Sequence, residues 1–187
     1  MKESFCFIAE VKTQSPFGFR AAYSWDVLFE LANMHGDILS IHTDLRWGGS
    51  WELLQKARRL TKKPILAKGI HAHDDDIKRA VDCGADWILA VGRIPTITQE
   101  KLVVEPDTLE ELKSIPGGLR VVWNSRDLKA GGLKKELFPD AREIWSGWLC
   151  QASNIKSIED VNLKADAVLV GTYLKEFIES LKKTREI

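Results

Sequence analysis

The chain has 187 residues, of which 44% are hydrophobic and 29% charged, and its 27 basic side chains balance its 27 acidic ones. This composition is ordinary for a globular protein with one full core, so we expect a single domain over residues 1–187. The balanced charge gives no overall attraction to nucleic acid or to an anionic membrane, and we predict neither as a partner. No stretch reads as a signal peptide or is apolar for long enough to span a bilayer, which favours a cytoplasmic protein.

The cysteines and histidines do not follow the spacing of a disulfide framework or of a common metal site. Cys6, Cys83 and Cys150 are far apart, odd in number and free of CxxC spacing, which fits a reducing compartment. His71 and His73 precede three aspartates, and such a group could suggest a metal site. Acidic residues at the start of a helix more often complement the helix dipole, so we predict no bound metal.

The first half of the chain alternates short apolar runs with helical patterns. An apolar run begins at Phe5 and ends in a turn sequence at 15–18, which predicts a buried strand, although so short a run is also compatible with a helix. Ser24 and Ser50 precede two of the helical patterns and can cap them. We expect further strands over 38–44, 64–70 and 86–92, and helices over 24–34, 50–60 and 74–83.

The second half keeps the strands but shortens the segments between them. We expect strands over 101–105, 119–124, 148–152 and 165–171, and helices over 108–114, 132–144, 158–164 and 173–185. Strands that alternate with helices indicate a parallel sheet with helices outside it. Eight of them predict an α/β fold, a compact (β/α)8 TIM barrel with reduced helices.

One helix of that barrel has no sequence segment long enough to form it. Only the eight residues 93–100 join the fourth and fifth strands, fewer than the roughly dozen that a parallel crossover needs. We therefore expect no helix there. If its absence exposes apolar barrel wall, a second copy of the chain could cover the patch, which makes a homodimer a hypothesis.

Polar residues recur at the carboxyl ends of the predicted strands, where the active sites of such barrels lie. Glu10 and Lys12 share one face of the first strand, and this pair by itself could equally be a structural ion pair. A convergent set on separate strands is harder to explain by stability and predicts an active site. Its members are Glu10, Lys12, Lys68, Glu105, Asn124, Arg126, Ser153, Gly171 and Thr172.

The same segments resemble the indole-3-glycerol phosphate synthase family, in the family's order and over nearly the whole chain. Asn124-Ser125-Arg126-Asp127-Leu128 and Ala165 to Gly171, which reads Ala-Asp-Ala-Val-Leu-Val-Gly, are the more specific matches. The others are Ile8-Ala9-Glu10-Val11-Lys12 with Ser15-Pro16, Gly48-Gly49-Ser50, Pro64-Ile65-Leu66-Ala67-Lys68 and Val104-Glu105. The resemblance implies a small phosphorylated substrate and a decarboxylating ring closure that gives indole-3-glycerol phosphate.

The resemblance also implies a role for each matching residue. Lys68 would be the general acid and Glu105 the acid/base carboxylate of the later dehydration. Glu10, Lys12 and Asn124 would orient the substrate and stabilise developing charge, while Arg126 and Ser15 would contact it. No cofactor is implied, because aromatisation of the indole supplies the driving force. We expect neighbouring cations and apolar walls to lower the pKa of Lys68, which suits an acid.

Backbone amides are expected to bind the substrate phosphate. Gly171 and Thr172 open the last predicted helix, although this pair alone would read simply as a helix start with a threonine cap. Ser153 to Ile155 match a Ser-Gly-Ile segment of the family whose glycine N–H meets the phosphate. Asn154 stands in place of that glycine, and asparagine tolerates the left-handed conformation better than most residues.

Several positions depart from the family pattern and keep a second reading open. Ala152 replaces a glutamate, Ile70 replaces a phenylalanine, and the family usually has several tens of residues before its equivalent of Glu10, which cover the barrel mouth. These departures favour a weak or inactive barrel that binds a phosphorylated or anthranilate-like ligand, alone or within a complex. A sugar-phosphate isomerase on the same scaffold is a third reading. The sister isomerase of tryptophan synthesis uses a cysteine and an aspartate as acid and base, and Cys6 does not sit where Glu10 and Lys12 do.

Overall fold

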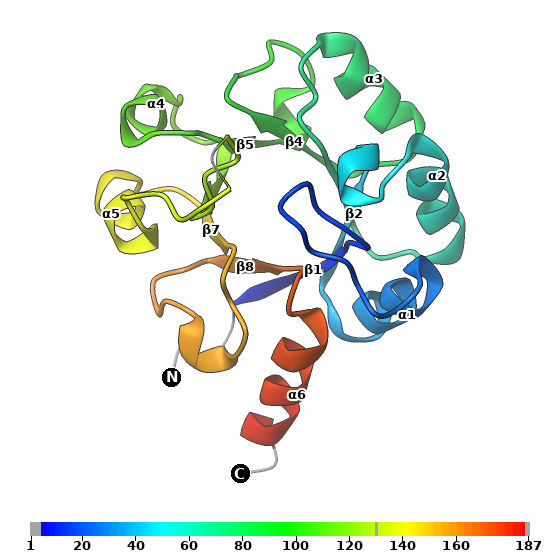
Figure 1. Ribbon diagram of the computed structural model, residues 1–187. Coiled ribbons are helices and arrows are strands. Elements are labelled where there is room, and N and C mark those ends of the chain that lie inside the picture. Colours follow the sequence, from blue (N-terminus) through cyan, green and yellow to red (C-terminus); the bar gives the residue numbers. More distant parts are fainter. Residues whose placement is uncertain (1–4, 130, 186–187) are drawn as a thin grey trace.

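Eight parallel strands form a closed barrel in which each strand pairs with the next and β8 pairs with β1 (Figure 1). The structure is a computed structural model and describes residues 5–129 and 131–185. The predicted TIM barrel is therefore confirmed, while residues 1–4, 130 and 186–187 of the expected domain lie outside the described residues. The strands are β1 (Cys6–Val11), β2 (Ile38–His42), β3 (Ile65–Lys68), β4 (Trp87–Val91), β5 (Leu102–Glu105), β6 (Arg120–Asn124), β7 (Leu149–Ala152) and β8 (Ala167–Val170).

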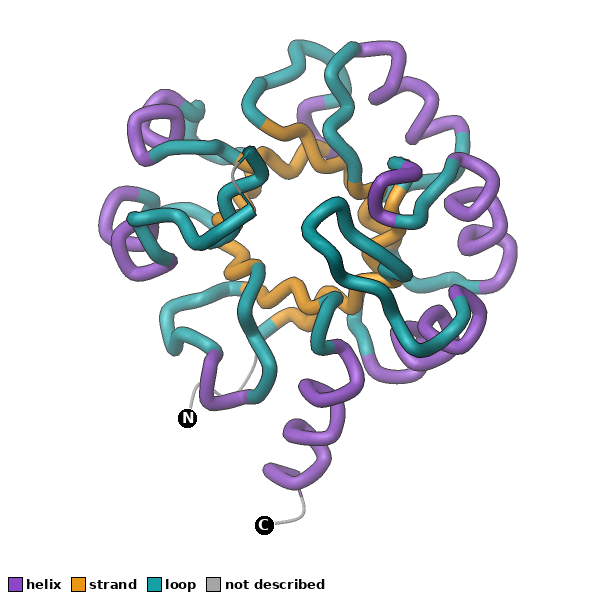
Figure 2. The backbone as a smooth tube through the Cα atoms, in the orientation of Figure 1, coloured by secondary structure: helices purple, strands orange, loops and turns teal. Residues whose placement is uncertain are grey.

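The helices form an outer ring around the strands (Figure 2). Ser24 and Ser50 cap their helices as predicted, because each side chain accepts a hydrogen bond from a backbone N–H of the first turn, and Thr108 caps a third helix in the same way. None of the described helices is long and apolar enough to cross a membrane. The helices are α1 (Trp25–His35), α2 (Trp51–Leu60), α3 (Asp74–Asp82), α4 (Leu109–Ser114), α5 (Phe138–Ile144) and α6 (Leu174–Arg185).

Two helices are shorter than the sequence predicts. The helix expected over 132–144 begins only at Phe138, because Leu133 forms a β-bridge with Arg126 and the Lys134 N–H bonds to the Ser125 carbonyl. The helix expected over 158–164 is a single 3-10 turn, η3 (Ile158–Asp160). Its continuation is prevented because the Asn162 N–H bonds to the Gln151 side chain instead of to a helical carbonyl.

The connection from β4 to β5 contains no α-helix, as predicted, and only a 3-10 turn, η2 (Gln99–Lys101), precedes β5. The barrel wall behind it is nevertheless covered. Ile88 and Leu102 are fully buried, and Ile94 and Ile97 of the connecting loop pack against the outer apolar clusters. The exposed patch that we considered is therefore absent, and the homodimer stays a prediction without that support.

Strand alternation separates the core into an outer and an inner part. Outward side chains such as Ala9 and Ile41 pack beneath the helices, while inward ones such as Ile8, Leu66 and Val122 fill the barrel. Two residues further along β1, the inward position is Glu10 rather than another apolar residue. The barrel interior is thus apolar along most of its length and polar at the carboxyl ends of the strands.

Trp123 provides a test of the packing on the side with short helices. It is fully buried between β6 and α5, and its indole N–H donates to the Glu136 carbonyl at 3.3 Å. We expect Trp123→Ala to lower the free energy of unfolding by about 3–5 kcal/mol, the usual cost of emptying a large aromatic site. Urea denaturation followed by circular dichroism measures this change.

Leu163→Ala is the matched control, because Leu163 is 69% exposed and its loss should change stability by less than about 0.5 kcal/mol. Similar losses in the two variants would contradict the packing described for Trp123.

Candidate active site

A pocket of about 360 Å³ opens at the carboxyl ends of the strands, the end at which barrel enzymes carry their chemistry. Figures 1 and 2 show that the loop between β1 and α1 reaches over part of the ring of strands, and Ser15, Phe17 and Phe19 of this loop line the pocket. Every site residue predicted from the sequence lines the pocket, namely Glu10, Lys12, Ser15, Lys68, Glu105, Asn124, Arg126, Ser153, Asn154, Gly171 and Thr172.

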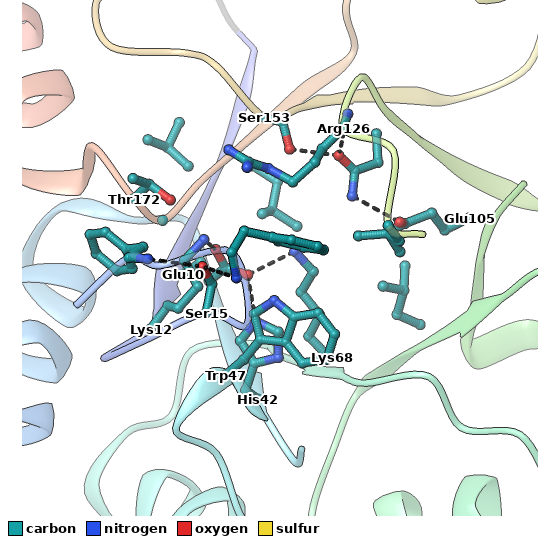
Figure 3. A pocket seen from close by; sticks show the side chains of 18 of the residues that line it. Glu10, Lys12, Ser15, His42, Trp47, Lys68, Glu105, Arg126, Ser153 and Thr172 are labelled. Atoms are coloured by element: carbon teal, nitrogen blue, oxygen red, sulfur yellow. Dashed lines mark hydrogen bonds and ion pairs between the residues drawn. The ribbon is translucent and has the colours of Figure 1, made fainter. Parts of the chain in front are cut away.

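The buried carboxylate of Glu10 is the centre of one half of the pocket (Figure 3). Its Oε1 lies 2.7 Å from Lys68 Nζ and 2.8 Å from His42 Nε2, and its Oε2 lies 3.4 Å from Lys12 Nζ. Glu10 is only 2% exposed, so a lone charge there would be strongly disfavoured. Two ammonium groups and an imidazole stabilise it instead.

Gly171 makes room for this carboxylate. A Cβ atom at position 171 would overlap the Glu10 carboxylate, so any side chain there would displace Glu10 from its partners. The predicted contribution of Gly171 was a backbone amide for phosphate. The structure shows a second reason for a glycine at this position, which the sequence alone did not suggest.

The electrostatics of the two lysines differ because their charged neighbours differ. Burial alone would raise the pKa of Glu10, but Lys12, Lys68 and His42 hold it well below its usual value. Burial tends to lower the pKa of Lys68, yet Glu10 and Glu105 outweigh it and raise that pKa. The expectation of a lowered Lys68 pKa is therefore wrong. Burial does lower the pKa of Lys12, helped by Lys68 and Arg126.

Glu105 and Asn124 form the other half of the pocket. Asn124 Nδ2 donates to Glu105 Oε1 at 2.9 Å, and Asn124 Oδ1 accepts from the Ser153 hydroxyl at 2.5 Å and from the Arg126 N–H at 3.0 Å. These bonds fix the amide orientation, so that its donor faces the carboxylate. Glu105 Oε2 is buried without a hydrogen-bond partner among the described residues. Burial raises the pKa of Glu105, although Lys68 and Asn124 oppose the rise.

A third part of the pocket consists of turns and a helix start. Ser153 and Asn154 have φ of 72° and 57°, so Asn154 adopts the left-handed conformation that its replacement of a glycine requires. Thr172 lies just before α6. The Ser15 hydroxyl accepts hydrogen bonds from the Phe17 and Phe19 amides, at 3.3 and 3.4 Å, and so shapes the loop over the pocket.

His42 and Trp47 are site residues that the sequence reasoning missed. His42 ends β2, faces the barrel interior, and pairs in register with Lys68. Trp47 lies in the 3-10 turn η1 (Leu45–Trp47), and its ring stacks on the imidazole with 5.7 Å between centroids and 3° between planes. The rule that selected polar strand ends would have found His42, since no candidate was taken from the second strand.

His71, through its side chain, and His73, through its backbone, take part in hydrogen bonds within the protein. His71 Nδ1 contacts the Leu89 carbonyl at 2.5 Å, and His71 Nε2 lies 3.0 Å from the Thr43 hydroxyl. Asp76 caps the start of α3 by accepting from the His73 N–H. Within residues 5–129 and 131–185, no group of three or more His, Cys, Asp or Glu side chains is arranged to hold a metal ion.

The buried Glu105 predicts a dependence of stability on pH. Its folded pKa lies above the unfolded value of about 4.3, so its ionisation destabilises the fold as pH rises through and above that range. Glu105→Gln removes this penalty and can still accept from Asn124. We expect its melting temperature to exceed that of the unsubstituted protein by a few degrees at pH 7.5 and by less near pH 4.5.

Differential scanning calorimetry at the two pH values measures the difference. Glu143→Gln, at an exposed position of α5, is the control and should leave the melting temperature unchanged. A gain for Glu105→Gln that is as large at pH 4.5 as at pH 7.5 would contradict a raised pKa.

Comparison with known proteins connects this pocket to a family. No protein-family model matches the chain. The indole-3-glycerol phosphate synthase of Aquifex aeolicus is 28% identical over 96% of this chain and 80% of its own length. That of Leptospira interrogans is 28% identical over 92% of this chain and 78% of its own length. The tryptophan biosynthesis protein TrpCF of Vibrio parahaemolyticus is 26% identical over 90% of this chain, which spans 40% of that relative. Together with the barrel, these matches show that the chain is similar to indole-3-glycerol phosphate synthases over most of its length.

Proposed function

We propose that this barrel is a carbon–carbon lyase of tryptophan biosynthesis, an indole-3-glycerol phosphate synthase. Its substrate would be 1-(2-carboxyphenylamino)-1-deoxyribulose 5-phosphate, and its reaction a ring closure with loss of carbon dioxide and water. The proposal takes the predicted domain, residues 1–187, as the catalytic unit. It draws on the names of the relatives and on the chemistry of the pocket.

One observation carries the proposal: a protonated lysine and a buried carboxylate face the same pocket from different strands. Lys68 ends β3 and Glu105 ends β5, and each is close enough to affect the pKa of the other. Lys68 has a proton to give, whereas the raised pKa of Glu105 suits a carboxylate that must take one up. Such a pair can catalyse a reaction that needs both an acid and a base.

Lys68 would act first, at the ketone carbon. A proton donated toward the ketone oxygen makes that carbon more electrophilic, so the ring carbon that bears the carboxylate can bond to it. Departure of carbon dioxide then restores the aromatic ring. The former ketone oxygen leaves as water, and Glu105 would accept the proton whose removal completes the indole.

The remaining polar groups would hold the substrate in place. Lys12 and Arg126 supply positive charge near the pocket, and the left-handed turn at Asn154 with the start of α6 offers backbone N–H groups for a phosphate. On the apolar side, Ile70, Leu89 and Trp47 line the pocket and can contact an aromatic ring. An elongated ligand with one anionic end and one aromatic end fits this distribution.

A second candidate function is ligand binding without turnover. Ala152, where the family has a glutamate, is 1% exposed, packs into the inner apolar cluster and does not line the pocket. A carboxylate near the reacting centre is therefore replaced by apolar core. In that case the barrel would bind a phosphorylated or anthranilate-like ligand, alone or within a complex.

The test is conversion of the carboxyphenylamino-deoxyribulose phosphate to indole-3-glycerol phosphate, followed by indole fluorescence and confirmed by product mass. Lys68→Ala and Glu105→Gln should each lower turnover by roughly a hundredfold or more, the scale of general acid and base catalysis. Lys62→Ala, at an exposed position just after α2, is the matched lysine control and should keep full turnover.

Two results would count against the lyase. Absence of product with the unsubstituted protein, together with a melting temperature raised by the same compound, would favour the binding function. Product formation that survives Lys68→Ala would reject Lys68 as the acid.

A further inference from the structure

His42 is a buried histidine in the site to which neither the family resemblance nor the proposed reaction gives a role. It is 3% exposed, and its Nε2 lies 2.8 Å from Glu10 Oε1. Its other ring nitrogen, Nδ1, is buried without a hydrogen-bond partner among the described residues. A buried polar group with one strong bond and one unused nitrogen calls for an explanation.

The chemistry of Glu10 determines where the imidazole proton is. Since the pKa of Glu10 is held well below its usual value, its carboxylate is ionised and can only accept, so His42 Nε2 must carry the hydrogen and donate it. A hydrogen on Nδ1 as well would leave a buried N–H unpaired. Burial lowers the pKa of His42, and Lys68 and Lys12 add to this effect against the attraction of Glu10. His42 is therefore the neutral Nε2–H tautomer at neutral pH.

The surroundings hold the ring in one orientation. Trp47 stacks on the imidazole, and the Arg46 guanidinium lies 4.9 Å from the centre of the same indole ring. Arg46 is in turn paired with Asp44. Asp44 lies close enough to His42 that His42 affects the pKa of Asp44. Stacking on the face of the ring and the Nε2 hydrogen bond to Glu10 at its edge leave the ring little freedom to rotate.

His42 and Lys68 share one oxygen atom. Both donate to Glu10 Oε1, at 2.8 and 2.7 Å, whereas Lys12 contacts Oε2. A donor on Oε1 withdraws electron density from it and makes it a weaker acceptor for any second donor. The proton of Lys68 is held chiefly by this same oxygen, and the proposed reaction requires that proton to leave.

We propose that His42 is a positioning residue that donates its Nε2–H to Glu10 Oε1 and thereby weakens the hold of Glu10 on the proton of Lys68. The hydrogen bond from His42 thus partly offsets the strong attraction of Glu10 for the Lys68 ammonium group. The consequence for turnover rests on the proposed function, but the effect on Lys68 is a property of the free protein.

The first experiment needs no substrate. Trace labelling with acetic anhydride at pH 8.5, read by mass spectrometry, reports the free-amine fraction of Lys68 relative to exposed Lys62. We expect labelling of Lys68 to fall roughly fivefold to tenfold in His42→Leu, which corresponds to a pKa increase approaching one unit. His42→Gln can place an amide N–H near the position of Nε2 and should restore much of the labelling. His42→Asn, whose shorter amide mimics Nδ1 instead, should restore less.

A second measurement checks the tautomer. Proton–nitrogen correlation spectra of histidine labelled with ¹⁵N should show His42 protonated on Nε2 alone at pH 7.5. Protonation on Nδ1, or equal Lys68 labelling in His42→Leu and the unsubstituted protein, would overturn the proposal. Thermal unfolding of each variant verifies that the protein compared is folded.

Turnover provides the catalytic arm. His42→Leu should lower kcat about tenfold with little change in KM, and His42→Gln should recover part of the loss; equal kcat in all three proteins would contradict a role in proton release. If the unsubstituted protein makes no product, the lyase proposal fails by itself, and the labelling and tautomer results still decide the role of His42.

Discussion

The site depends on one buried negative charge. Glu10 can remain ionised in the barrel interior only because Lys68, Lys12 and His42 surround it, and these come from the ends of β1, β2 and β3. Each partner is in turn kept charged or oriented by Glu10, so none of the four has an independent position. An ionised carboxylate away from water requires such compensation. Binding of a ligand anion has to compete with this network, because the lysines that would receive it are already engaged.

A second carboxylate in the same pocket experiences the opposite environment. Glu105 has one amide donor and one oxygen without a partner among the described residues, so burial dominates and raises its pKa. Two glutamates within one barrel mouth thus differ in proton affinity through their neighbours alone. Divergent environments of this kind let two identical side chains in one site differ in their protonation.

The sequence was informative wherever local rules decide structure. Strand positions followed the apolar runs, Ser24 and Ser50 capped their helices, and the strand-end rule gathered the pocket residues. It failed where contacts distant in the chain decide. Residues 132–134 bond back to the segment after β6 instead of forming a helix. The sign of the Lys68 pKa shift depends on its 2.7 Å contact with Glu10 and on the nearby Glu105. No periodicity encodes such differences. The selection of polar residues at strand ends would also have identified His42, at the end of β2.

The vacant space at Gly171 links two parts of the barrel that are remote in sequence. The backbone there closes the ring beside β1 and opens the last helix, and the Glu10 carboxylate occupies the volume that a side chain would need. Evolutionary change at the two positions is therefore coupled in one direction. A larger residue at 171 would displace Glu10 from its partners unless Glu10 had first been shortened. A lineage that made both changes could restore the original pair without that displacement only by reversing them in the opposite order. Position 171 therefore needs a glycine as long as the Glu10 carboxylate occupies that volume.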